Sequence, residues 1–232
     1  MNRLFTAALV LNIAAMLFAT DLFAQNKEKR DMPGAFNKIE VSKGANVTIS
    51  QCDANEGLEI ATDGCPTSDV ETLVNKGTLI VRMKKRTPGS AVQVTVNCKD
   101  FNEIDVKRGA TLETSTTFQH KGRFVIGVGA QSEVIMDLEV DELVVDAHTC
   151  NIKLEGKATK QNVNIAGTVG SSKYDAEDLV SEDVIIKAVD SEAVVNATRS
   201  LEANAISCTI RYKGNPANVR EVTTGNGLVE KM

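Results

Sequence analysis

The sequence contains no tryptophan, four prolines and two histidines among 232 residues, and only 4% of its residues are aromatic. Scarce aromatic side chains weaken any function that stacks sugars or bases on flat rings. Because there are only two histidines and no Cys-x-x-Cys pair, we expect no metal site. The net charge of -5 provides no basic surface, so we expect neither nucleic acid nor an anionic membrane as a partner.

Helical periodicity is also missing, and a different repeat takes its place. From Ile104 to the C-terminus, units of about twenty residues follow one another, a spacing typical of stacked repeats. Each unit has two short segments in which alternate residues are apolar, joined by small or turn-forming residues. Examples are Phe124-x-Ile126-x-Val128 with Val134-x-Met136, Leu143-x-Val145-x-Ala147 with Ile152-x-Leu154, and Val184-x-Ile186-x-Ala188 with Ala193-x-Val195.

Such short segments cannot bury an apolar face alone, so the units must stack. Stacking similar coils gives an all-β parallel β-helix, or β-solenoid, in which strands of successive coils pair in parallel. The core should then be a ladder of like residues about 4.8 Å apart. We expect one inward ladder to contain Val145, Ile165, Ile186 and Ala203.

The first 25 residues are typical of a signal peptide. Arg3 precedes an apolar stretch from Leu4 to Ala19, and cleavage is expected near Ala24 or Gln25. The stretch is short for a membrane span, and no lipoprotein cysteine ends it. We therefore expect export to the periplasm or cell surface, with no stable membrane span and a mature chain of residues 26–232.

Residues 33–103 form a less regular β region that precedes the repeat coils of residues 104–232. Its alternating runs predict strands, whereas residues 69–75 fit either a short helical turn or a strand. The expected strands are Lys38-Ile39-Glu40-Val41, Ala45-Asn46-Val47-Thr48-Ile49, Thr78-Leu79-Ile80-Val81 and Ala91-Val92-Gln93-Val94-Thr95-Val96.

Three landmarks resemble the family of auto-transporter adhesins with a head GIN domain. They are the run from Phe36 to Gln51, the run from Asn75 to Val81, and Ile210 to Pro216 followed by Gly225-Asn226-Gly227. The resemblance implies a right-handed parallel β-helix, an exported protein and an adhesin-like or surface-structural role. It brings no catalytic or cofactor residues. Several coil turns depart from the family pattern, because they lack the usual glycines.

Five cysteines remain in the mature chain. Cys150 and Cys208 occupy equivalent slots of their coils, where Gln131, Gly170 and Ser191 stand in other units. Three coils separate the two cysteines, or about 14 Å, which is beyond disulfide reach. We expect both to be buried free thiols. The sequence His148-Thr149-Cys150 could also form an activated nucleophile, but a coil corner is the simpler interpretation.

Cys52 and Cys65 flank a polar insert. A disulfide between them is the pairing that we favour, and Cys52 with Cys98 is the alternative.

Carboxylates recur at one place in successive coils, which predicts a solvated outer face. A catalytic pair or a weak divalent-cation site is the competing interpretation. His120 is expected in a loop. The recurring carboxylates are Asp137, Glu139, Asp141, Glu142, Asp175, Glu177, Asp178, Glu182 and Asp183.

Two functions remain. The first is a non-catalytic exported β-helix that binds an envelope or surface protein or a glycan, without catalytic residues or cofactor. The second is a β-helix lyase or hydrolase that acts on acidic polysaccharide. Because the connections are short, we expect no cleft, which favours the first. A homo-oligomer is also possible, since the last coil, from Asn218 to Met232, leaves one end uncovered while the region before Ile104 can cap the other.

Overall fold

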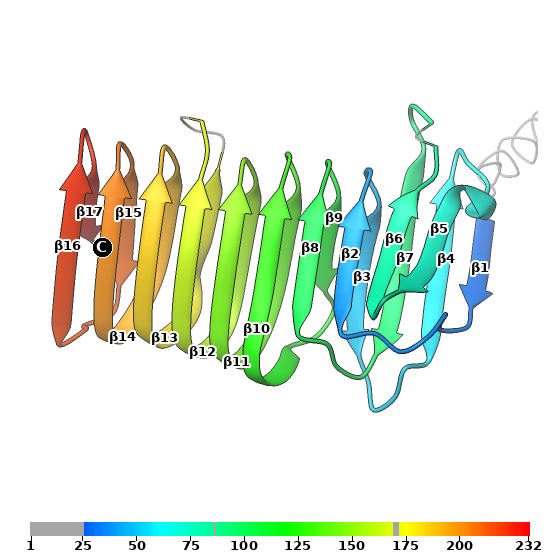
Figure 1. The fold of residues 1–232 in the computed structure, drawn as a ribbon, viewed down its shortest axis with the longest axis horizontal. Helices are drawn as coiled ribbons and strands as arrows, with labels where there is room; N and C mark the ends of the chain where they lie inside the picture. Colours follow the sequence, from blue (N-terminus) through cyan, green and yellow to red (C-terminus); the bar gives the residue numbers. More distant parts are fainter. Residues whose placement is uncertain (1–25, 86, 169–171) are drawn as a thin grey trace, which may run out of the picture.

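The chain folds into a column of stacked β-strands (Figure 1). The computed structural model describes residues 26–85, 87–168 and 172–232; the predicted signal peptide, residues 1–25, lies outside them. One short 3-10 turn, η1 (Thr67–Asp69), is the single helical element in these ranges. None of the described residues form a helix long and apolar enough to cross a membrane. The predicted all-β solenoid is therefore confirmed, with about seven turns of ~19 residues.

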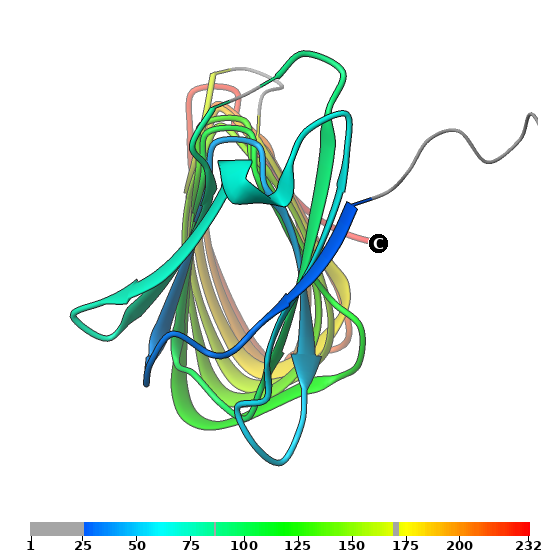
Figure 2. The same cartoon turned by 90° about the vertical axis from the view of Figure 1, so that its right-hand side faces the viewer.

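Two sheets face each other across the core (Figure 2). The first sheet pairs its strands in the order β5, β6, β2, β8, β10, β11, β12, β13, β14, β16. Its strands are β5 (Val70–Asn75), β6 (Thr78–Met83), β2 (Lys38–Ser42), β8 (Glu103–Lys107), β10 (Phe118–Gly129), β11 (Glu133–His148), β12 (Asn151–Ala166), β13 (Lys173–Val189), β14 (Glu192–Ile206) and β16 (Asn218–Thr224).

The second sheet contains the N-terminal parts of the long strands β11 to β14, which bend from one sheet into the other. Its remaining strands are β1 (Asn26–Arg30), β4 (Gly57–Asp63), β7 (Ala91–Cys98), β3 (Asn46–Gln51), β9 (Thr111–Thr114), β15 (Thr209–Lys213) and β17 (Leu228–Lys231). Neighbouring segments that the sequence divides into separate units thus merge into single bent strands.

The predicted ladder residues all point inward, but one of the four, Ile165, belongs to a neighbouring ladder. Val145 pairs with Val163, and Val163 pairs with Ile186, which pairs with Ala203. Ile165 instead pairs with Ala147 and Ala188. The reason is unequal coil length: Val163 lies 18 residues after Val145, and Ile186 lies 23 residues after Val163. Because side chains alternate between the two faces of a strand, a shift of two residues changes which residues pair but leaves the same residues facing inward.

Antiparallel strands, which the sequence pattern did not predict, cover the N-terminal end of the column. The β2–β3 coil sits between β6–β7 and β8–β9, while β4, β1 and β5 add antiparallel edges beyond it. Arg30 ties this cap together, because its guanidinium donates to the carbonyls of Val70 (2.8 Å) and Thr67 (2.9 Å). At the other end β16 is exposed at every position, so the column is closed at one end only.

Tight corners connect the first-sheet end of each strand to the second-sheet start of the next strand, and a small buried side chain follows each of these corners. Thr149, Asp190 and Ser207 adopt positive φ there (52°, 47° and 51°), so these corners form without glycine. The buried slot that follows holds Ser132, Cys150, Ser172, Ser191 and Cys208. Cys150 and Cys208 therefore do share a slot. Its other members, however, include Ser132 and Ser172 instead of Gln131 and Gly170; Gly170 lies outside the described residues.

We expect Gly156→Ala to destabilise the fold. Gly156 has a φ of 106°, and a Cβ there would lie 2.2 Å from the Leu138 carbonyl oxygen of the neighbouring coil. The free energy of unfolding should fall by about 1–3 kcal/mol, measured by urea denaturation. Gly129→Ala is the matched control, because its Cβ would approach nothing closer than 3.7 Å. Equal stabilities for the two variants would contradict this account of coil contact.

Candidate ligand groove

A corner runs along the column where the long strands bend between the sheets. In each of these strands, the alternation of inward and outward residues breaks at the same place. Two outward residues follow each other there, as in Asp141-Glu142 on β11, Thr159-Lys160 on β12 and Glu182-Asp183 on β13. Because the strands pair in register, these breaks stack into one continuous corner.

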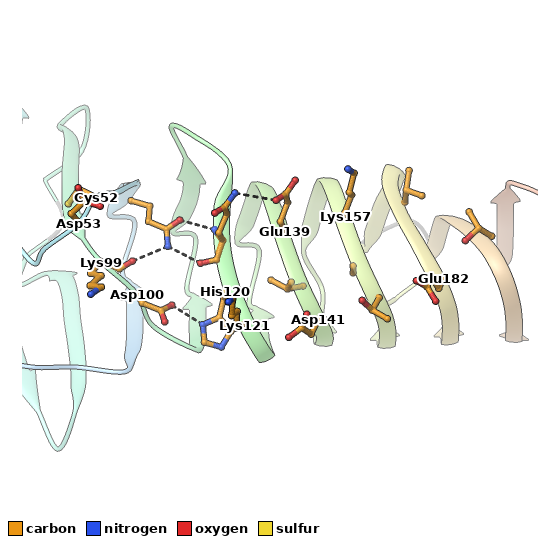
Figure 3. A pocket seen from close by; sticks show the side chains of 17 residues that line it. Cys52, Asp53, Lys99, Asp100, His120, Lys121, Glu139, Asp141, Lys157 and Glu182 are labelled. Carbon is orange, nitrogen blue, oxygen red and sulfur yellow. Dashed lines mark hydrogen bonds and ion pairs between the residues drawn. The ribbon is translucent and has the colours of Figure 1, made fainter.

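A groove of about 970 Å³ follows this corner across several strands (Figure 3). It begins at the loops after β3 and β7 and continues over β10, β11, β12 and β13 to β14. Its charged lining residues are Asp53, Lys99, Asp100, Lys121, Glu139, Asp141, Lys157 and Glu182, together with His120. The expectation that short connections leave no cleft is wrong, because the bent strands and an irregularity in β10 between His120 and Arg123 shape the hollow.

Gln51 holds the N-terminal end of the groove in place. Its amide nitrogen donates to the carbonyls of Lys99 (2.9 Å) and Gln119 (2.8 Å). Its amide oxygen accepts the Gln119 backbone N–H at 2.7 Å. This side chain thereby joins the ends of β3 and β7 to β10, across strands that are distant in sequence. These bonds fix the part of β10 that carries His120 against the ends of β3 and β7.

His120 lies in β10, not in the loop that the sequence suggested. Its Nδ1 lies 2.8 Å from Asp100 Oδ1, and its side chain is 12% exposed. The imidazole also packs near the Phe124 ring, with centroids 5.9 Å apart. An imidazole held by a carboxylate through one nitrogen can accept or donate a proton through the other.

The lysines of the groove lack ionic partners. Within the described part of the chain, Lys99, Lys121 and Lys157 form no side-chain hydrogen bond or ion pair. Lys157 pairs in register with Glu139, but their charged groups are not within ion-pair distance. Several of the carboxylates, in contrast, are engaged: Asp141 accepts the Gly122 N–H at 2.7 Å, and Glu182 lies 2.9 Å from Arg199.

The recurring carboxylates predicted from the sequence are spread over several surfaces. Glu139, Asp141 and Glu182 line the groove. Glu142 and Asp183 line a second hollow on the first sheet, and Asp175 and Glu177 line a small one near the C-terminus. Across residues 26–85, 87–168 and 172–232, no group of three or more His, Cys, Asp or Glu could hold a metal ion.

The favoured disulfide between Cys52 and Cys65 is wrong. The Cys52 N–H donates to the Cys98 carbonyl (2.9 Å) at one end of β7, whereas Asp63, just before Cys65, faces Ala91 at the other end. The missed strand β4, which fills the predicted polar insert, carries the chain back along β7. Seven residues of strand span about 23 Å, far beyond the reach of a disulfide.

All five cysteines are free thiols. Burial raises the pKa of Cys150 to about 11 and that of Cys98 to about 12. Burial also raises the pKa of Cys208. A nucleophile needs its thiolate, so these shifts oppose a catalytic role for Cys150. The interpretation of Cys150 as an inward thiol at a coil corner is confirmed.

Comparison with known proteins finds a matching family model and several solved structures with a similar fold. The family model described as "Putative auto-transporter adhesin, head GIN domain" matches residues 35–216. No curated protein matches the chain. Among solved structures, a "putative adhesin" from Bacteroides fragilis superposes with a TM-score of 0.76 at 19% identity, covering 90% of this chain and 97% of its own.

Two structures from Parabacteroides distasonis are also similar. A "putative lipid binding protein" has a TM-score of 0.69 at 21% identity and covers 90% of this chain and 98% of its own. A "putative adhesin" has a TM-score of 0.66 at 22% identity and covers 91% and 98%. At these identities the likeness establishes the fold.

We expect one fast-reacting thiol in the native protein. Cys52 is partly exposed, whereas Cys65, Cys98, Cys150 and Cys208 are buried. Titration with a chromogenic disulfide reagent at pH 8 should show one rapid equivalent, which Cys52→Ser removes, and five equivalents in urea. Three equivalents after unfolding without reductant would reveal a disulfide and contradict the free-thiol arrangement.

Asp183→Asn should lower stability in a pH-dependent way. Asp183 accepts hydrogen bonds from Arg199 (2.9 Å) and Ser200 (2.7 Å), which hold the pKa of its carboxyl at about 2, below its ordinary value. Because the folded-state pKa is depressed, this stabilisation is present above a pH of about 4 and is lost as the pH falls toward 2.

The loss in free energy of unfolding should be about 1 kcal/mol at pH 7 and should be much smaller near pH 2, where about half of the folded carboxyls are protonated. Chemical denaturation at both pH values measures it. Asp178→Asn is the control, since this exposed carboxylate lies on the same strand and has no hydrogen bond to the described residues. A pH-independent loss would show that Asp183 acts through packing instead of charge.

Proposed function

The chain belongs to the head GIN domain family of auto-transporter adhesins, and on that premise we propose that it is an exported, non-catalytic envelope protein that binds a linear, carboxylate-bearing glycan in the corner groove. The proposed role is adhesin-like: the rigid column presents a polar groove to a surface polymer. The predicted signal peptide of residues 1–25 supports export. No cofactor is needed for this role.

The observation that carries the proposal is the set of three lysines without ionic partners. Lys99 follows β7, Lys121 lies on β10 and Lys157 lies on β12. Since neighbouring strands are about 4.8 Å apart, Lys121 and Lys157 are separated by about 10 Å along the column. Cations spaced along an open groove suit an extended chain with repeated negative charges better than a compact ligand.

The neutral and acidic lining residues complete such a site. Gln119, Thr159 and Thr198 line the same groove, and they offer groups that can hydrogen-bond sugar hydroxyls. Glu139 and Asp141 add acceptors for hydroxyl donors. Because the lining has no aromatic platform apart from the mostly buried His120, recognition would depend on polar contacts and charge.

A β-helix lyase or hydrolase acting on acidic polysaccharide is the second candidate. The observation that favours it is the His120–Asp100 pair beside Lys121, with Glu139 and Asp141 in the same groove. An oriented imidazole near a cation could remove a proton next to a carboxylate, or carboxylates could act as acid and base. Both candidates use the same ligand class, so one experiment separates them.

Calorimetry with a soluble polyuronate should detect binding by the purified protein. Replacing both Lys121 and Lys157 with glutamine should weaken the affinity by roughly tenfold or more, because two charge-assisted contacts are removed. Lys153→Gln, on the outer face of the second sheet, is the control and should bind normally. Neutral dextran should not bind.

The same samples are then analysed for chain length. A bound polymer of unchanged length supports the binding role. Shortened products that disappear with His120→Gln would establish the enzyme instead. If the polyuronate does not bind, or if the double lysine variant binds as tightly as the unchanged protein, the groove proposal is wrong.

A further inference from the structure

The charges in the strand part of the corner groove alternate in sign from one strand to the next (Figure 3). Among the described residues that line it, β10 contributes the cation Lys121, β11 the carboxylates Glu139 and Asp141, β12 the cation Lys157, and β13 the carboxylate Glu182. Cations thus stand on the first and third of these strands, about 10 Å apart. The loops at the N-terminal end of the groove add Asp53, Lys99 and Asp100.

Opposite charges on neighbouring strands often serve the sheet itself, by pairing across it. On the second sheet Arg211 and Glu230 do so, because they are partners in register and lie 2.8 Å apart. In the groove Lys157 and Glu139 are also partners in register, but Glu139 accepts a hydrogen bond from the Gln119 amide instead, at 3.2 Å. The alternating charges of the groove are therefore not used up by cross-strand pairing.

Strand β11 presents negative charge between the two lysines. Within the described residues, Glu139 accepts from the neutral Gln119 amide and Asp141 accepts from the Gly122 N–H at 2.7 Å. Neither donor carries a charge, so both carboxylates keep theirs. A ligand carboxylate placed over β11 would be repelled, whereas hydroxyl and amide N–H groups would find acceptors there.

Strand β13, beyond Lys157, offers a ligand carboxylate no free cation. Its lining carboxylate, Glu182, lies 2.9 Å from Arg199, and Asp183 accepts from the same guanidinium at 2.9 Å. Val180, the partner of Lys157 in register, lines the groove with a side chain that is 43% exposed. An uncharged part of a ligand suits this position.

The spacing of the strands matches the repeat of an extended sugar chain. In a chain of equatorially linked pyranoses, each sugar advances the polymer by close to one strand spacing. A chain that lies along the groove therefore places about one sugar over each strand, since the strands are about 4.8 Å apart. Sugars over β10 and β12 then face Lys121 and Lys157, and the sugar between them faces Glu139 and Asp141.

We propose that the corner groove selects a glycan with carboxylates on alternate sugars and uncharged, donor-bearing sugars between them. This inference rests on the proposed glycan-binding function and narrows its ligand class. A polymer with a carboxylate on every sugar would place one of them against β11 however it slid along the groove. Selection thus depends on repulsion at β11 as well as on attraction by the two lysines.

Non-specific attraction would give the opposite preference. A polymer with a carboxylate on every sugar has twice as many negative charges per sugar as an alternating polymer. If the lysines acted only as a general positive field, the more highly charged polymer would bind more tightly. A preference for the alternating polymer is therefore diagnostic of the strand-by-strand pattern.

Calorimetry with two oligosaccharides of equal length tests the proposal. One alternates glucuronic acid with N-acetylglucosamine, and the other contains glucuronic acid alone. The unchanged protein should bind both, and the alternating oligosaccharide at least about fivefold more tightly. A neutral oligosaccharide of N-acetylglucosamine should bind more weakly than either, because it offers the lysines no negative charge.

Reversing the charge on β11 should abolish this preference. Glu139→Lys places a third cation between Lys121 and Lys157, so the dissociation constant of the glucuronic acid oligomer should fall about tenfold, and that of the alternating oligomer by clearly less. Glu133→Lys is the matched control, because it makes the same charge change on the same strand, outside the groove. It should leave the ratio of the two affinities unchanged. Circular dichroism confirms that each variant is folded.

Equal affinities for the two oligosaccharides, or tighter binding of the glucuronic acid oligomer, would overturn the alternation and leave the proposed glycan binding intact. The same change of ratio in Glu139→Lys and Glu133→Lys would also overturn it, because net charge would then explain the selectivity. If neither oligosaccharide binds to the unchanged protein, the proposed function itself is wrong and the alternation falls with it.

Discussion

Parallel pairing of successive coils in register is the constraint on which this structure depends. Each residue lies about 4.8 Å from an equivalent residue in the coil before and the coil after. An inward position must therefore suit three coils at once, which is why the Val145, Val163, Ile186 and Ala203 ladder is apolar throughout. Coils change length where this register shifts, as it does between Asp175 and Val180 of β13 opposite β14.

The same constraint creates the surfaces that can bind. When two successive outward residues interrupt the alternation in one strand, register repeats the interruption in the next strand, and isolated bends become a continuous groove. The groove is polar because the outward residues on both sides of each bend face water. The groove departs from the regular repeat where the register of β10 shifts between His120 and Arg123, and the His120–Asp100 pair lies there.

The sequence predicted what period and alternation encode: the all-β solenoid, the inward faces and the buried slot of Cys150 and Cys208. It did not predict features that depend on chain direction or coil length. The prediction put Ile165 in the ladder where Val163, two residues earlier, belongs, because the coils differ in length. The Cys52–Cys65 disulfide was wrong because β4 returns antiparallel, which local pattern does not reveal. The groove was missed because the prediction required long loops, whereas bent strands form it, and His120 gave no local signal of its partner Asp100.

The two ends of the column have different consequences for assembly. Repeated stacking could in principle continue indefinitely, since each coil offers an edge to the next. Antiparallel β1, β4 and β5 interrupt this repetition at the N-terminal end, because they reverse the strand direction that successive coils share. The two ends of the column therefore differ: antiparallel strands cover the N-terminal end, whereas β16 is exposed at the other.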